Sequence, residues 1–180
     1  MNVVCDVGGS VATGVVAGLI SSVLLFAIQL FIRPRIKISS EICENAAKNV
    51  YSVKIVNCSR VNLMEVEYTL YLCHHSGDGI TQMCPLEMKR KNLSFIPAYN
   101  KRDADSRYAV RLAFDLDKDT LCTKDSYLRF SIGAKHTLTG TTAFFSREYR
   151  LEDIHCGRFE TGSSLKILYD PVICGAKSCK

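Results

Sequence analysis

A long stretch without charge at the start of the chain limits most strongly what the chain can fold into. From Val7 to Ile32 no residue is charged, and Asp6 is the single charged residue before Arg33. As a helix, the apolar residues 11–32 would span about 33 Å at roughly 1.5 Å per residue. A bilayer's hydrocarbon core is about 30 Å thick. The stretch therefore predicts a transmembrane helix over residues 11–32.

A cleaved signal peptide is the alternative for this stretch, but it requires a basic start, a shorter apolar run and a small-residue cleavage site. Here the apolar run leads directly into the basic segment of residues 33–37, Arg33-Pro34-Arg35-Ile36-Lys37. Positive charge lies on this flank alone, so the positive-inside rule places the N-terminus, residues 1–10, outside the cell. We expect a single-pass protein of the inner (cytoplasmic) membrane with its C-terminal domain in the cytoplasm.

Small residues recur every four positions along the predicted helix, at Ser10, Gly14, Gly18 and Ser22. A stripe of this kind lets a second helix approach closely, which predicts helix–helix oligomerisation, although glycine is common in membrane helices in any case. Gln29 is the strongly polar side chain of the stretch. It could contact another helix, line a polar pore, or reach the membrane interface.

Beyond residue 37 the hydrophobic period changes to two. Of the 180 residues 47% are apolar, and 23 Lys+Arg against 18 Asp+Glu give a net charge of +5. This composition argues against a disordered chain and against two large domains. Clear alternation covers residues 108–117, 127–135, 51–56 and 66–72, and shorter apolar runs lie near 36–43, 84–88, 93–97, 141–150 and 163–169.

Seven to nine short strands are typical of an antiparallel β-sandwich or a small β-barrel. We therefore predict a mainly β domain over residues 38–170. Residues 171–180 are expected to form a loose tail.

The sequence contains no motif of a hydrolase, a metalloprotease, a phosphate-binding loop or a dinucleotide-binding fold, and we predict that the protein is not an enzyme and uses no cofactor. His74 and His75 precede Asp78 without a further ligand at metal-site spacing. Asp115, Asp117 and Asp119 resemble the start of a calcium loop, but Thr120 and Ser126 occupy the positions of its glycine and its glutamate. No metal site is predicted.

Nine cysteines occur without a C-x-x-C pair, at positions 5, 43, 58, 73, 84, 122, 156, 174 and 179. In a reducing cytoplasm they are most simply buried thiols. A redox or metal role for Cys174 and Cys179 is the lesser alternative.

Basic residues supply two candidate binding sites. Arg33, Arg35 and Lys37 would sit in the negative potential of the inner leaflet and bind lipid head groups, each contributing about 1 kcal/mol, although anchoring of the topology also explains them. The middle of the domain offers candidates for binding an anionic ligand: Lys89, Arg90, Lys91, Lys101, Arg102 and Arg107. A solvated basic edge explains these six equally well.

Residues 139–160 carry a family resemblance. Thr139-Gly140-Thr141-Thr142 leads to Tyr149, then to Glu152-Asp153-Ile154, Gly157 and Arg158-Phe159-Glu160. This order resembles the end of the cytoplasmic domain of inward-rectifier potassium channels. The resemblance implies an immunoglobulin-like β-sandwich of a family whose domains assemble as tetramers, bind regulatory ligands and respond to anionic lipid at basic residues just after the last helix. The chain has no pore helix and no T-x-G-Y-G filter, so potassium-selective conduction is not expected.

The layout also resembles transmembrane β-domain effectors of bacterial anti-phage signalling systems, an associational argument without a shared motif. Together these features predict a membrane effector: the β domain binds a small anionic ligand or nucleotide signal, a homo-oligomer forms, and clustered helices permeabilise the lipid bilayer. No nucleic-acid polymer is expected as a partner. A non-conducting membrane-tethered adaptor, or an accessory subunit of a channel, is the alternative.

Overall fold

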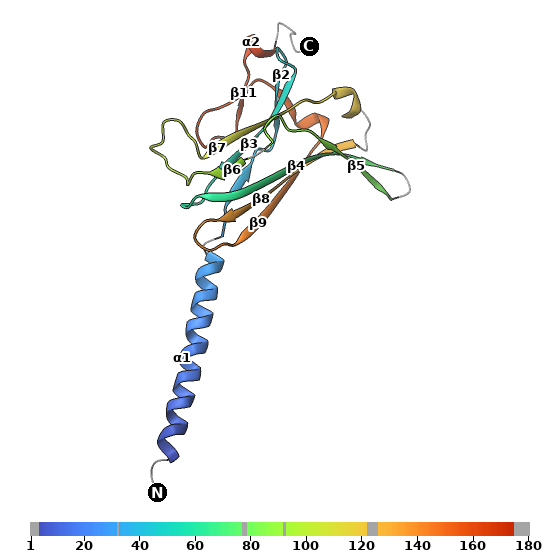
Figure 1. The fold of residues 1–180 in the computed structure, drawn as a ribbon. Helices are drawn as coiled ribbons and strands as arrows, with labels where there is room; N and C mark the ends of the chain where they lie inside the picture. The colour runs from blue at the N-terminus through green and yellow to red at the C-terminus, as the bar shows by residue number, and fades with distance from the viewer. Residues whose placement is uncertain (1–3, 32, 77–78, 92, 122–125, 175–180) are drawn as a thin grey trace. The chain divides into compact units, whose positions relative to one another are not determined.

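The structure of the protein is a computed structural model that describes residues 4–31, 33–76, 79–91, 93–121 and 126–174. For residues 4–12, 29–31 and 119–120 it describes the backbone only. The chain forms two units, a helical unit of residues 1–33 and a β unit of residues 34–180 (Figure 1). The β unit therefore begins at Pro34, inside the segment predicted to be a basic connection.

The helical unit consists of α1, Val4–Phe31, which starts earlier than the predicted span. Its described side chains from Thr13 to Ile28 are exposed, apart from the half-buried Ala27. Within the part of the chain that the structure describes, no helix combines the length and the apolar character that a membrane crossing requires. The prediction of a helix is thus confirmed for residues 11–31, residue 32 lies outside the described part, and the structure does not identify this helix as a membrane span.

The β unit contains two five-stranded sheets. In the first, β3 (Val50–Asn57) is central: β7 (Ala109–Phe114) pairs along one edge, and β1 (Ile36–Ile38) and β2 (Ile42–Asn45) share the other. β10 (Ile154–Cys156) extends this sheet by pairing with β2 in parallel, whereas the other pairs are antiparallel. The prediction of antiparallel sheets holds apart from this pair.

In the second sheet the long strand β4 (Leu63–His75) pairs with β8 (Ser126–His136) along one edge. Its other edge is divided between β6 (Leu93–Ile96) and β5 (Thr81–Leu86). β9 (Thr142–Tyr149) pairs with β8 and forms the edge of the sheet. Figure 1 shows β4, β8 and β9 running side by side.

One hydrophobic core joins the two sheets. Val53, Ile55 and Leu112 of the first sheet belong to the same buried cluster as Leu70 and Phe130 of the second. Among the described strands no hydrogen-bonded pair connects the sheets, so they pack as two layers, as in a β-sandwich. Every residue of the cluster lies in the β unit. This unit therefore has a complete core of its own.

The C-terminal segment covers the outer face of β3. It contains a 3-10 turn, Leu151–Asp153, and the small hairpin of β11 (Arg158–Phe159) and β12 (Ile167–Leu168). Lys54 is consequently buried in β3, whereas the alternation of residues 51–56 predicts it on a solvent face. Its Nζ donates to the carbonyl oxygens of Glu160 at 2.6 Å and Ser164 at 2.7 Å.

The segment ends in a short helix, α2 (Pro171–Cys174), where the sequence predicts a loose tail. A disulfide joins Cys174 to Cys156 of β10. The backbone N–H of Ala47 also donates to the carbonyl of Ile173 at 3.0 Å. These contacts attach residues 171–174 to the sandwich, and residues 175–180 lie outside the described part.

Candidate functional site

The loops around Pro34 form one end of the β unit, which we call the proximal end: residues 34–35, 57–62, 97–108 and 136–142. The backbone N–H of Cys58 donates to the Arg35 carbonyl at 2.7 Å, and the Arg35 N–H donates to Ser59 Oγ at 2.7 Å. Tyr99 N–H donates to the Ser59 carbonyl at 2.9 Å. These bonds tie the incoming chain to two of the loops.

Asn62 connects the remaining loop. Its side-chain Oδ1 accepts from the Ala98 N–H at 2.8 Å, and its carbonyl accepts from the Thr137 N–H at 3.3 Å and hydroxyl at 3.1 Å. Asn57 Nδ2 donates to the carbonyls of Val61 and Pro97. Hydrogen bonds among the four segments therefore pair their polar backbone groups. The loops are held in fixed positions and form a single surface.

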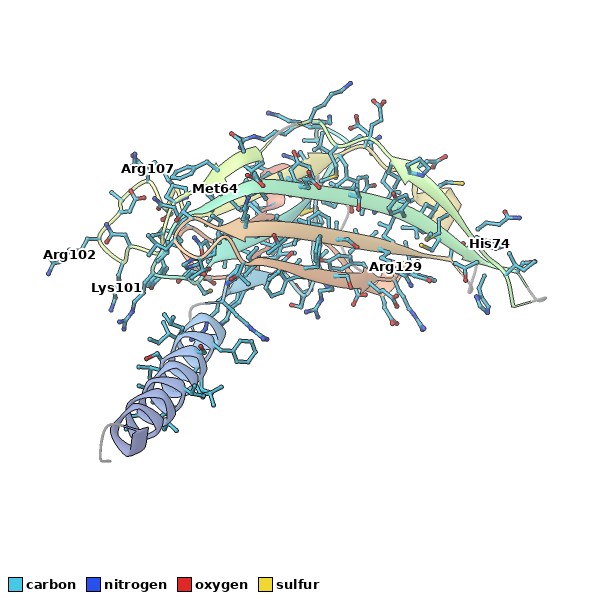
Figure 2. All side chains as sticks on the ribbon, turned by 60° about the horizontal axis from the view of Figure 1, so that its bottom comes forward. Met64, His74, Lys101, Arg102, Arg107 and Arg129 are labelled. Atoms are coloured by element: carbon cyan, nitrogen blue, oxygen red, sulfur yellow. A yellow bond between two sulfur atoms is a disulfide. The ribbon has the colours of Figure 1, made fainter. Side chains whose placement is uncertain are left out.

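The proximal end is basic. Its loops hold five exposed cations, which we call the proximal cations: Arg35, Arg60, Lys101, Arg102 and Arg107. Two carboxylates accompany them, so 5 − 2 gives +3. Asp103 pairs with Arg107 at 3.4 Å. Figure 2 shows Lys101, Arg102 and Arg107 gathered at one end of the sandwich, with His74 at the other.

Two large apolar side chains are exposed among these charges. Leu138, in the turn between β8 and β9, is 75% exposed, and Tyr99 is 39% exposed. A basic surface with protruding apolar and aromatic groups is the composition that favours contact with the interface of an anionic bilayer.

The six residues predicted to bind an anion do not form one site. Lys101, Arg102 and Arg107 precede β7, whereas Lys89, Arg90 and Lys91 lie beside its far end, where the Lys89 N–H donates to the Ala113 carbonyl at 2.8 Å. At roughly 3.3 Å per residue, β7 separates the two groups by about 20 Å. Lys89 Nζ is also paired with Asp115 at 2.7 Å.

The predicted lipid-binding residues are distributed over both units. Arg35 belongs to the proximal cations, and Lys37 is exposed in β1. Arg33 is exposed and is the last residue of the helical unit.

A shallow groove lies between the edge strands of the two sheets, and we call it the edge groove. It has a volume of about 360 Å³. Its lining comes from β1, β9 and the loop before β12, and consists of Ile36, Lys37, Ile38, Phe145, Ser146, Arg147 and Leu165. Lys37 and Arg147 are exposed, and neither forms an ion pair among the described residues.

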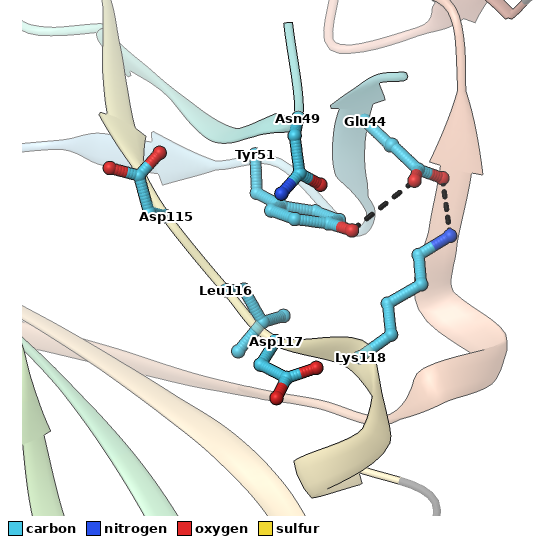
Figure 3. Close-up of a pocket in the computed structure, with 7 residues that line it drawn as sticks. All are labelled: Glu44, Asn49, Tyr51, Asp115, Leu116, Asp117 and Lys118. Carbon is cyan, nitrogen blue, oxygen red and sulfur yellow. Dashed lines mark hydrogen bonds and ion pairs between the residues drawn. The ribbon is translucent and has the colours of Figure 1, made fainter.

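A second hollow, of about 520 Å³, opens beyond the start of β3 and the end of β7, and Figure 3 shows its lining. Glu44 accepts a hydrogen bond from the Tyr51 hydroxyl at 3.2 Å and pairs with Lys118 at 2.6 Å. Burial, reinforced by Glu44, raises the pKa of Tyr51 to about 12, so the phenol stays protonated. Asp115 and Asp117 line the other side. The lining therefore carries three carboxylates against the single ammonium of Lys118, and this excess of negative charge disfavours an anionic ligand.

No group of His, Cys, Asp and Glu in the described part of the chain is arranged to hold a metal ion. His74 Nδ1 lies 3.0 Å from Ser126 Oγ and His75 Nδ1 lies 3.1 Å from Thr81 Oγ1.

The prediction that the cysteines are buried thiols is wrong for Cys156 and Cys174, which form a disulfide. Cys43 and Cys73 are buried thiols as predicted, whereas Cys58 is half-buried and Cys84 is exposed.

The small-residue stripe of α1 is described in part. Apart from the backbone of the helix itself, the described residues leave open space beside Gly14 and Gly18, and the Ser22 hydroxyl donates to the Gly18 carbonyl of its own helix at 2.8 Å. The side chains of Ser10 and Gln29 lie outside the described residues.

Sequence reasoning missed Arg60 and Arg147. Arg60 lies within a turn, apart from other basic residues in the sequence, and so forms no basic cluster there. Arg147 could have been found from the sequence. It falls on the same face of the predicted strand 141–150 as Phe145 and Tyr149, where an apolar residue is expected.

No protein-family model matches this chain, and a search of curated proteins likewise finds no match.

Proposed function

We propose that this chain is a ligand-responsive membrane effector, in which α1 holds the β unit at a bilayer and the proximal cations face an anionic surface. The observation that carries the proposal is the collection of five cations from three loops around the residue where the chain enters the β unit. Each such charge near an anionic leaflet contributes about 1 kcal/mol.

The helix supports the membrane part of this proposal in one respect. Its described side chains are uncharged and, apart from Ala27, exposed. They cover residues 13–28, somewhat fewer than the roughly 20 that a crossing needs. A crossing therefore depends on the flanking positions, residues 11–12 and 29–32, which are apolar in sequence except for Gln29. Only Ile32 and Arg33 separate Phe31 from Pro34, so the sequence leaves no linker between helix and sandwich.

In the effector, an anionic ligand bound by the β unit favours self-association, and Gly14 and Gly18 let the helices approach closely enough to permeabilise the membrane. The β unit lies in the cytoplasm of this inner-membrane protein. An immunoglobulin-like topology and a role in anti-phage defence belong to the same proposal, and they are supported only by the resemblance of residues 139–160 and by the layout.

The surface is tested with residues 34–180, whose core is complete, and vesicles of phosphatidylglycerol and phosphatidylcholine. We expect binding to vesicles rich in phosphatidylglycerol that weakens about fivefold for each of Lys101→Gln and Arg102→Gln, the loss of about 1 kcal/mol per charge. Lys89→Gln and Lys91→Gln remove equal charge at the far end of β7 and serve as matched controls. Equal losses from both pairs would show that net charge alone, and not the proximal end, drives binding.

The effector step is tested with the full chain in dye-loaded liposomes. Leakage should occur, and Gly14→Leu with Gly18→Leu should abolish it together with crosslinked oligomers. Replacing residues 11–32 by a polyleucine helix distinguishes the adaptor alternative, because a mere tether would keep its cellular activity. An inserted protein that never causes leakage would rule out the effector.

A further inference from the structure

The edge groove lies where each sheet ends in an incompletely paired strand. Among the described strands, β1 pairs only with β3 and β9 pairs only with β8, so the groove is bordered by one edge from each sheet. The Tyr149 hydroxyl donates to the Ser39 carbonyl at 2.8 Å, and this bond links the end of β9 to the residue after β1. The two borders of the groove are therefore held at a fixed separation.

Arg147 is in an unusual place for a charged residue. β9 alternates, and Phe145, Arg147 and Tyr149 share the face that is directed to the core, where Tyr149 is fully buried. Arg147 nevertheless remains exposed, because the facing strand β1 is only three residues long. Its guanidinium thus lies at the rim of the groove instead of inside the core.

The lining combines positive charge with an apolar floor. Lys37 and Arg147 carry the charge, and no carboxylate is among the lining residues. Phe145, Ile38 and Leu165 are half-buried and present apolar surface, and Ser146 adds an exposed hydroxyl. Guanidinium and ammonium groups bind phosphate oxygens through charge-assisted hydrogen bonds, and an aromatic ring offers a stacking surface.

The floor of the groove is positioned from behind by Lys54. The carbonyl of Ser164, the residue before Leu165, accepts from Lys54 Nζ at 2.7 Å. The neighbouring Arg111 donates to the Phe159 carbonyl at 3.0 Å. These partly buried bonds fix the loop that supplies Leu165, so the groove is formed before any ligand arrives.

We propose that the edge groove binds a small organophosphate, with its phosphate between Lys37 and Arg147 and its apolar or ring portion over Phe145. This inference names the ligand class for the sensing step and rests on the proposed function for its biological use. Binding itself is measurable in residues 34–180, without the helix.

A structural explanation for Arg147 competes with this proposal. A charged residue directed inward on an edge strand prevents that edge from pairing with another chain. Such a role predicts that removing Arg147 causes self-association and leaves phosphate compounds unaffected. This structural explanation also assigns no role to Lys37.

The test exploits the absence of tryptophan from the chain. Phe145→Trp in residues 34–180 places a single indole in the groove, and its fluorescence is titrated at about 0.15 M salt with AMP, with inorganic phosphate and with dihexanoyl phosphatidate, a lipid soluble as a monomer. We expect saturable binding of AMP or of phosphatidate, and whichever binds tighter identifies a nucleotide or a lipid as the source. Arg147→Gln and Lys37→Gln should each weaken it about tenfold, a loss of about 1.4 kcal/mol.

Lys91→Gln and Lys48→Gln, at exposed lysines outside the groove, are the matched controls and should change the affinity less than twofold. Thermal melting of the Arg147→Gln and Lys37→Gln variants checks that both are folded, and calorimetry with the unsubstituted Phe145 checks the reporter.

Three results would overturn the proposal: no binding of any probe, inorganic phosphate binding as tightly as the organic compounds, or self-association of Arg147→Gln with unchanged affinity. If AMP or phosphatidate binds but the full chain causes no dye leakage from liposomes, the proposed function is rejected and the binding proposal stands.

Discussion

The buried ammonium of Lys54 combines a favourable and an unfavourable contribution to stability. Its two carbonyl partners lie 2.6 and 2.7 Å away, while burial and then the nearby Arg111 lower the pKa of Lys54 to about 8, against a weaker opposite effect of Glu160. Removing the amine leaves two carbonyls without a donor. Lys54→Met should therefore reduce the free energy of unfolding by about 2 kcal/mol at pH 7, measured by urea denaturation. Lys48→Met, at an exposed lysine, should be close to wild type.

The pH dependence of this difference has a definite sign. The ordinary pKa of lysine is 10.5, so between pH 8 and 10.5 the unfolded chain holds more of this proton than the folded protein. The contribution of Lys54 to stability then rises with pH. The stability difference between wild type and Lys54→Met should consequently widen from pH 8 to 9.5. A constant difference would contradict the lowered pKa.

His136 should make the proximal end sensitive to acid. The ring is buried at the end of β8, burial lowers its pKa, and Nδ1 accepts from the Thr139 N–H at 3.4 Å. Because the folded pKa lies below the ordinary value of 6.5, the unfolded chain takes up the proton first as the pH falls. Stability should be complete above pH 6.5 and decline below it.

His136→Asn keeps an acceptor near Thr139 but does not titrate. We expect the melting temperature of wild type to fall more steeply from pH 7.5 to 5.5 than that of this variant. His155→Asn, at an exposed histidine, should retain the wild-type slope. Identical slopes in all three proteins would assign the acid sensitivity to carboxylates instead.

At the scale of elements, the disulfide should act locally. α2 buries none of its residues and is attached by the Cys156–Cys174 bond and by the bond from Ala47 to Ile173. Cys174→Ser should raise amide hydrogen exchange more than tenfold at Ala47 and in residues 171–174, with β8 unchanged. The free energy of unfolding should fall by at most about 3 kcal/mol, the chain-entropy value for a loop of this size. Faster exchange throughout β8 would show instead that the bond stabilises the whole sandwich.

Strands that alternate on one buried face were predictable from sequence. Residues 109–114 and 126–136 form β7 and β8 where the pattern indicates, because in each strand buried side chains alternate with more accessible ones. The burial of the outer face of β3 could not be predicted from its own sequence. The segment that buries Lys54 is distant in the chain, since Glu160 is separated from Lys54 by 106 residues. The pairing of Cys156 with Cys174 depends on the same distant packing.

The candidate sites show the same limit. Proximity along the chain placed Lys89, Arg90 and Lys91 with Lys101 and Arg102, but β7 separates the two groups, and register alone decides which loops share an end. The glycine at position 157 is explained by the backbone and not by a binding site. Its φ of 150° and the adjoining β12 leave no room for a Cβ, so only glycine fits between β10 and β11.

At the scale of the whole molecule, two features point to opposite compartments. The basic residues at the start of the β unit favour the cytoplasm, whereas a disulfide is typical of an oxidising compartment. In the cytoplasm that we propose, the Cys156–Cys174 pair would be kept reduced in cells and would form after lysis.

Cys84 allows the orientation to be measured directly. Its thiol is exposed on β5, whereas Cys43 and Cys73 are buried and should react slowly in the folded protein. With the β unit in the cytoplasm, a membrane-impermeant maleimide should not label Cys84 in intact cells and should label it after permeabilisation. Cys84→Ser identifies the signal, because the label that disappears in this variant belongs to Cys84. Labelling of Cys84 in intact cells, together with an oxidised Cys156–Cys174 pair after acid trapping, would place the sandwich outside and reverse the proposed orientation.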